Sequence, residues 1–125
     1  MIGMRQGWRY TTNCRRGDVI LVRFPNSDLK TYKKRPALVV QADGLNTALG
    51  QRIATLITSN LARTGQTRVL VQKDSDLGKC MGLRMDSVVV TDNLVTVLER
   101  EMDKVIGKCG EMGLVENALR TTLAL

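Results

Sequence analysis

Short apolar runs separated by turn residues occupy most of this chain between Asp18 and Leu98. The runs are rich in valine, isoleucine and threonine, and most have the length of a β-strand rather than of a helix. We predict strands at residues 18–24, 36–41, 52–58, 67–71, 87–91 and 95–98. Short strands with turn residues between them are typical of a small barrel or half-barrel, and 125 residues suffice for one such domain.

The end of the chain has a helical pattern instead. Apolar residues recur three and four positions apart within 111–123, which predicts an amphipathic helix over the barrel. A shorter helix is expected at 99–106, and residues 73–82 are expected to form a loop. Residues 1–14 show no period and are expected to be a flexible N-terminal extension, so that 15–125 form the single, mostly β domain with its C-terminal helix.

Positive charge is concentrated in the first part of the sequence. Residues 1–36 contain nine Lys or Arg and two acidic residues, whereas residues 37–125 contain ten of each, so the first part holds the whole net charge of +7. Lys30, Lys33 and Lys34 lie between the first two predicted strands, and Arg35 directly precedes the second. This arrangement suits a phosphate polymer, although a solvated basic tail and loop would have the same composition.

Several kinds of site are not expected in this chain. It contains no histidine, and Cys14, Cys80 and Cys109 are widely spaced without a CxxC pair, so we expect no zinc site and no Ser–His or Cys–His nucleophile. We expect no cofactor. The sequence has no apolar run long enough to span a bilayer and no secretory signal, which predicts a cytoplasmic protein without membrane contact.

The remaining polar residues suit RNA cleavage, because RNA supplies its own nucleophile, the 2′-hydroxyl. Such cleavage needs positive charge where the phosphate oxygens become more negative. The guanidinium of Arg35 can bond two oxygens at once, and Pro36 limits its backbone. Thr58 and Ser59 end the third strand with two hydroxyls. In the alternative interpretation, Arg35 is only a polar residue before a proline, and Thr58-Ser59 only enters a turn.

Four segments together resemble the MazF/PemK-type endoribonuclease toxins of type II toxin–antitoxin systems. They are Arg16-Gly-Asp-Val-Ile-Leu-Val, Lys34-Arg35-Pro-Ala-Leu-Val-Val, Leu56-Ile-Thr-Ser and Asp86-Ser87-Val-Val. The resemblance implies a small SH3-like twisted barrel, a homodimer, and metal-independent, sequence-specific cleavage of single-stranded RNA such as mRNA, which inhibits growth.

The resemblance also implies roles for individual residues. Arg35 and Thr58 match the family's main catalytic residues. Positions that contact RNA are matched by Ser59, Ser87, Asp92 and Asn93, beside the basic Lys30, Lys33 and Lys34. The chain departs from the family where many members have an Arg-Thr-Ile strand, because it has Val95-Thr-Val-Leu there; base preference is affected more than catalysis.

Partners and alternatives follow from the same features. The family implies an antitoxin, and the positive charge suits an acidic one that orders on binding. With only Trp8, Tyr10, Phe24 and Tyr32 as aromatic residues, an RNA-stacking sheet of the RRM type is not expected. Two alternatives to the nuclease are a non-catalytic nucleic-acid-binding barrel and a toxin of the related fold that inhibits DNA gyrase.

Overall fold

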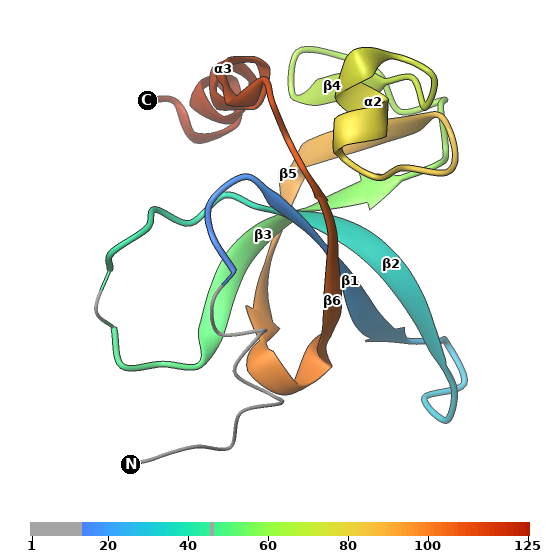
Figure 1. Ribbon diagram of the computed structural model, residues 1–125, viewed down its shortest axis with the longest axis vertical. Coiled ribbons are helices and arrows are strands. Elements are labelled where there is room, and N and C mark those ends of the chain that lie inside the picture. Colours follow the sequence, from blue (N-terminus) through green and yellow to red (C-terminus); the bar gives the residue numbers. More distant parts are fainter. Residues whose placement is uncertain (1–13, 46) are drawn as a thin grey trace.

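The computed structural model describes residues 14–45 and 47–125 and contains one antiparallel sheet. Its strands are β1 (Asp18–Pro25), β2 (Tyr32–Val39), β3 (Gln51–Thr58), β4 (Arg68–Val71), β5 (Ser87–Leu98) and β6 (Met102–Lys108). The helices are α2 (Asp76–Cys80), the 3-10 turn η1 (Glu99–Glu101) and α3 (Met112–Leu123). The strand order is β4-β5-β3-β2-β1-β6, so the curved sheet does not close and β4 and β6 form its edges (Figure 1). This is the mostly β fold with a C-terminal helix that the sequence predicts.

The sheet buries apolar residues on both of its faces, because successive side chains of a strand point to opposite sides. In β1, Val19 packs in a cluster that includes Val115 and Ala118 of α3. The next residue, Ile20, packs with Val22 in a second cluster. Helix α3 therefore covers one part of the sheet, as Figure 1 shows, and β1 contributes buried side chains to both of its faces.

The prediction of a helix at residues 99–106 is wrong. Only Glu99–Glu101 form a single 3-10 turn, and β6 follows it directly. Strand β6 pairs with β1, and the paired residues lie 80 to 90 positions apart in the sequence; Ile20 lies opposite Val105, for example. Because this pairing partner is so distant, the local sequence of residues 102–106 has no pattern that indicates a strand, and these residues are also compatible with a helix.

Two other predictions differ from the structure in detail. The strands expected at 87–91 and 95–98 are one continuous strand, β5. The segment 73–82, expected to be a loop, contains the short helix α2. Its start is stabilised by Ser75, whose hydroxyl oxygen accepts a hydrogen bond from the Gly78 amide at 3.0 Å.

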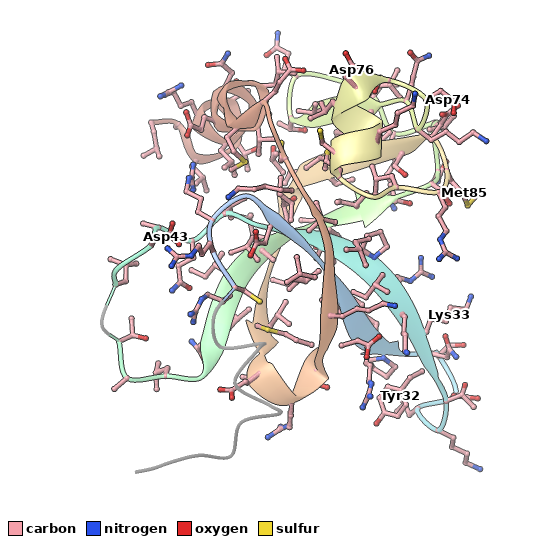
Figure 2. All side chains as sticks on the ribbon, in the orientation of Figure 1. Tyr32, Lys33, Asp43, Asp74, Asp76 and Met85 are labelled. Atoms are coloured by element: carbon pink, nitrogen blue, oxygen red, sulfur yellow. The ribbon has the colours of Figure 1, made fainter. Side chains whose placement is uncertain are left out.

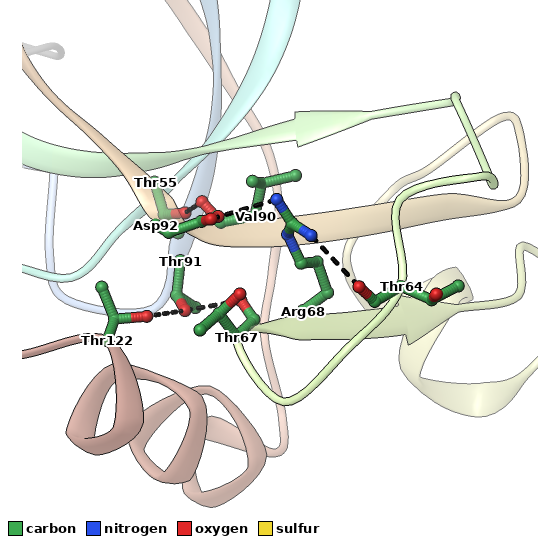
Figure 3. A network of polar contacts seen from close by, with 8 residues as sticks. All are labelled: Thr55, Thr64, Thr67, Arg68, Val90, Thr91, Asp92 and Thr122. Atoms are coloured by element: carbon green, nitrogen blue, oxygen red, sulfur yellow. Dashed lines mark hydrogen bonds and ion pairs between the residues drawn. The ribbon is translucent and has the colours of Figure 1, made fainter.

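Strand β5 is bent by a bulge at residues 91–93, where its register with β3 shifts. Buried threonines satisfy the polar groups there (Figure 3). Thr55 donates its hydroxyl to the Val90 carbonyl at 2.5 Å, and Thr91 donates its hydroxyl to the Thr67 carbonyl at 2.6 Å. The bulge lets one strand pair with β3 along most of its length and with β4 near its start.

Of the predicted N-terminal extension, residues 1–13 lie outside the described residues. Cys14 is 4% exposed, and its sulfur lies 3.9 Å from that of Met102 on β6. Burial raises the pKa of the Cys14 thiol. None of the helices in the described part of the chain is long and apolar enough to cross a membrane.

Candidate functional site

A cleft of about 720 Å³ lies where β2, β6 and the segment before β5 approach one another. Its walls include residues 34–36 of β2, 82–85 of the connection after α2 and 103–106 of β6, together with Ile57 and Ser59 at the end of β3. Met85, on the connection, and Lys33, on β2, are labelled on the same side of the molecule in Figure 2. The cleft therefore combines segments that are far apart in sequence.

Arg35 lines this cleft from β2, where it lies opposite Val22 of β1. Its side chain is exposed, and it forms no ion pair with the residues that the structure describes. The backbone of Arg35 is held by the β1–β2 pairing on one side. It is followed by Pro36, which has no N–H to donate but whose ring fixes its φ angle. The structure thus presents an available guanidinium on a stiff strand.

Thr58 and Ser59 lie at the end of β3, next to β2. The pairing of these strands ends with Ala37 opposite Leu56, and Arg35 and Thr58 each lie two residues beyond this last pair. Ser59 is exposed and lines the cleft, whereas Thr58 is half-buried and is not among the lining residues. The Thr58 hydroxyl oxygen accepts a hydrogen bond from the Asn60 amide at 3.1 Å, which leaves its own proton free to donate.

The basic segment expected between the first two strands is shorter than predicted, because β2 begins at Tyr32 and already contains Lys33 and Lys34. The connection itself is a structured turn. One Asp28 carboxylate oxygen accepts the amides of Lys30 and Thr31 at 2.8 and 3.0 Å, and these bonds lower the pKa of Asp28. Lys30 and Lys33 are exposed and do not line the cleft. Lys34 does line it, but its ammonium is paired with Asp103 of β6 at 3.1 Å.

The other predicted RNA contacts are placed differently. Ser87 lies at the cleft but is 4% exposed, and its hydroxyl donates to the Met85 carbonyl at 2.7 Å. Asp92 and Asn93 lie on the bulge of β5 and do not line the cleft. Asp92 is paired with Arg68 at 3.0 Å, beside a separate hollow of about 410 Å³ next to α3. The role of these three residues as RNA contacts stays a prediction.

Two cationic residues of the cleft were missed from the sequence. Arg84 precedes β5 and Lys104 lies on β6; both are exposed and line the cleft. No motif surrounds either residue, and their convergence depends on the β1–β6 pairing, so the sequence contains no signal that could have found them. Among the described residues that line the walls, Asp103 is the only acidic one, and the hydrogen bond from Lys34 lowers the pKa of its carboxyl.

The geometry suits a negatively charged, extended ligand. Lys34, Arg35, Arg84 and Lys104 face one cleft, against the single carboxylate of Asp103. Within the described residues no three cysteine or acidic side chains gather as metal ligands would. The fold and the site therefore define a small half-barrel protein with a C-terminal helix and a cationic cleft, and such a cleft suits a polyanion.

Comparison with known proteins narrows this class to a family. Residues 15–123 match the PemK-like, MazF-like toxins of type II toxin–antitoxin systems, and the chain belongs to this family. No curated protein sequence gives a significant match to it.

Solved structures with the same fold include an endoribonuclease from a mycobacterial species in complex with its cognate antitoxin. It is 26% identical, with a TM-score of 0.68 over 90% of this chain and 96% of that one. A second mycobacterial endoribonuclease is 25% identical, with a TM-score of 0.65 over 90% and 92% of the two chains. MazF from Deinococcus radiodurans is 21% identical, with a TM-score of 0.66 over 90% and 97%, and supports the fold.

Proposed function

We propose that this protein is the toxin of a type II toxin–antitoxin system and cleaves single-stranded RNA, such as mRNA, at specific short sequences without a metal ion. The observation that carries the proposal is the cationic cleft with Arg35 on its β2 wall and Ser59 beside it. Family membership and the two mycobacterial endoribonucleases of the same fold support the reaction class.

In the proposed reaction, the 2′-hydroxyl of the substrate attacks the adjacent phosphorus. The bond to the 5′-oxygen breaks, leaving a 2′,3′-cyclic phosphate and a 5′-hydroxyl. Arg35 bonds the non-bridging oxygens as negative charge grows on them, which a fixed guanidinium does well. Thr58 donates its hydroxyl to the same phosphate. These two residues are catalytic in the proposal because they touch the reacting group. The proposal is supported by their positions, since each lies two residues beyond the last pair of β2 and β3, Ala37 with Leu56.

Partners of the toxin are part of the proposal. A homodimer is expected by analogy with the family. An acidic antitoxin segment would meet the positive charge of the first 36 residues, where the net charge of +7 resides. The mycobacterial endoribonuclease that was solved with its cognate antitoxin supports such a complex. We also expect the exposed Lys30 and Lys33, with Lys34, to contact the RNA backbone outside or at the rim of the cleft.

Incubation of the protein with mixed-sequence RNA in EDTA tests this function. We expect discrete fragments with 2′,3′-cyclic phosphate and 5′-hydroxyl ends, identified by mapping both ends. RNA that is bound in a salt-dependent manner yet stays intact would identify a non-catalytic binding protein instead. Inhibition of DNA gyrase supercoiling with intact RNA would identify a gyrase poison. Either of these results contradicts the proposal.

A further inference from the structure

Two short segments of the cleft wall each carry a basic residue followed by an apolar one. Arg84-Met85, before β5, and Lys104-Val105, on β6, each place a cation beside an apolar residue, and all four residues line the cleft. Met85 is 60% exposed and Val105 is 46% exposed, which is high for large apolar side chains. An apolar surface beside two cations matches the two parts of a nucleotide, its base and its phosphate.

The two cations are available for a ligand. Neither Arg84 nor Lys104 forms an ion pair with the described part of the chain, and both side chains are exposed. The carboxylate of Asp103 is engaged by Lys34 at 3.1 Å. The positive charge on this side of the cleft is therefore not neutralised by a dedicated partner, as it would be in a structural salt bridge.

The segment that carries Arg84 and Met85 is held in place by close backbone contacts. A Cβ atom at Gly107 would lie 2.3 Å from the Met81 carbonyl carbon, and one at Gly82 would lie 2.1 Å from the Ile106 carbonyl oxygen. Gly82 also has φ +71°, which favours glycine. The end of α2 thus packs directly on β6, so the two cation–apolar pairs share one rigid wall.

We infer that Arg84 and Lys104, with Met85 and Val105, form a nucleotide subsite of the cleft, apart from Arg35. The guanidinium and ammonium bind one backbone phosphate of the substrate RNA, and the base next to it packs on the methionine and valine side chains. The polarisable thioether of methionine suits a flat π surface. The inference rests on the proposed function, and it adds a residue set that binds substrate away from the bond that breaks.

Binding of a non-cleavable RNA tests the subsite. The probe is an oligonucleotide that spans the wild-type protein's mapped cleavage site, with a 2′-deoxynucleotide at that site and, in a second series, one neutral methylphosphonate at each position in turn. The variants are R84Q and K104Q. Their controls are R120Q, on α3, and K108Q, at the end of β6, which remove the same charges away from the cleft.

We expect R84Q and K104Q each to weaken binding by roughly 5- to 10-fold, the order for one charge-assisted contact at a surface, while the controls change it by less than about twofold. A methylphosphonate at one position should weaken wild-type binding and remove most of the further effect of R84Q. With cleavable RNA, KM should rise while kcat stays within about twofold, because the lost contact is made equally before and during reaction.

The possible failures are distinguishable. If wild-type protein cleaves RNA but R84Q and K104Q bind the probe like their controls, the subsite is refuted and the proposed function stands. If the two variants weaken binding of an acidic peptide and leave RNA binding unchanged, the wall is a protein contact and the inference is wrong. If wild-type protein cleaves no RNA, the proposed function fails and the inference fails with it.

Discussion

Lys34 and Arg35 are neighbouring cations on β2 that differ in their ion pairing. The Lys34 ammonium is paired with Asp103 of β6, whereas the exposed Arg35 forms no ion pair with any residue that the structure describes. The Lys34–Asp103 pair joins β2 to β6 across β1, which lies between them in the sheet. This ion pair neutralises the charge of Lys34 in the cleft and leaves the Arg35 guanidinium available to a ligand.

This difference predicts a change in a single pKa. The hydrogen bond from Lys34 holds the pKa of Asp103 below its ordinary value of 3.8. In K34Q we expect the Asp103 pKa to rise toward that value, measured by carbon NMR of the carboxyl group across a pH titration. K33Q, which alters an exposed lysine outside the cleft, is the control and should leave the pKa nearly unchanged.

The sign of the pH effect on stability follows from the same shift. Because the folded-state pKa of Asp103 is lowered, its contribution to stability is present above the unfolded-state pKa and is lost as pH falls through the folded-state value. The stability difference between wild type and K34Q should therefore shrink in strong acid. An Asp103 pKa that is equal in both proteins would contradict the ion pair.

At the scale of elements, the bulge of β5 depends on buried hydroxyl groups. Thr55 is fully buried and donates to the Val90 carbonyl, so T55V leaves that carbonyl without this donor while keeping the side-chain shape. We expect T55V to lower the free energy of unfolding by about 1–3 kcal/mol, measured by urea denaturation. T96V, at an exposed position of β5, should change it by less than about 0.5 kcal/mol. Equal effects of the two substitutions would contradict the role of the Thr55 bond.

The close packing of the end of α2 on β6 predicts that a side chain at Gly107 destabilises the protein. In G107A the new methyl group would meet the Met81 carbonyl carbon at 2.3 Å, so backbone must move. We expect a loss of roughly 1–3 kcal/mol in the free energy of unfolding, together with weaker RNA binding as the wall with Arg84 shifts. G110A is the matched control, because nothing lies within 4 Å of the added atom. A G107A protein as stable as G110A would show that α2 does not pack on β6 in this way.

Sequence patterns predicted those elements whose signals are local. Strands β1 to β4 and helix α3 have apolar periodicity and turn residues of their own. Arg35 was predicted from the Arg-Pro pair in the second strand region, and Ser59 from the hydroxyls that follow the third. Strand β6 was not predicted because it is stabilised by pairing with β1, which is distant in the sequence. Arg84 and Lys104 were missed for the same reason, since only the folded sheet brings them to Arg35.

At the scale of the whole molecule, the fold engages some of the basic side chains in ion pairs and leaves others exposed in the cleft. The first 36 residues hold the whole net charge of +7, but Arg16 is paired with Glu116 of α3 and Lys34 with Asp103. The cleft adds Arg84 and Lys104 from the part of the chain whose charges sum to zero. The cationic surface of the cleft is thus built from both parts of the sequence. From the first part, Arg35 lines the cleft without an ion pair to any described residue, whereas Lys34 is paired with Asp103.

The most direct measurement is the single-turnover rate of RNA cleavage at saturating protein, in EDTA, for wild type and R35A. Removing a group that stabilises charge in the transition state should slow this step by about 100- to 1,000-fold. R100A, which removes an exposed arginine of η1 outside the cleft, should cleave within about twofold of wild type. An R35A protein that is folded and cleaves RNA as fast as R100A would contradict the assignment of this cleft as the active site.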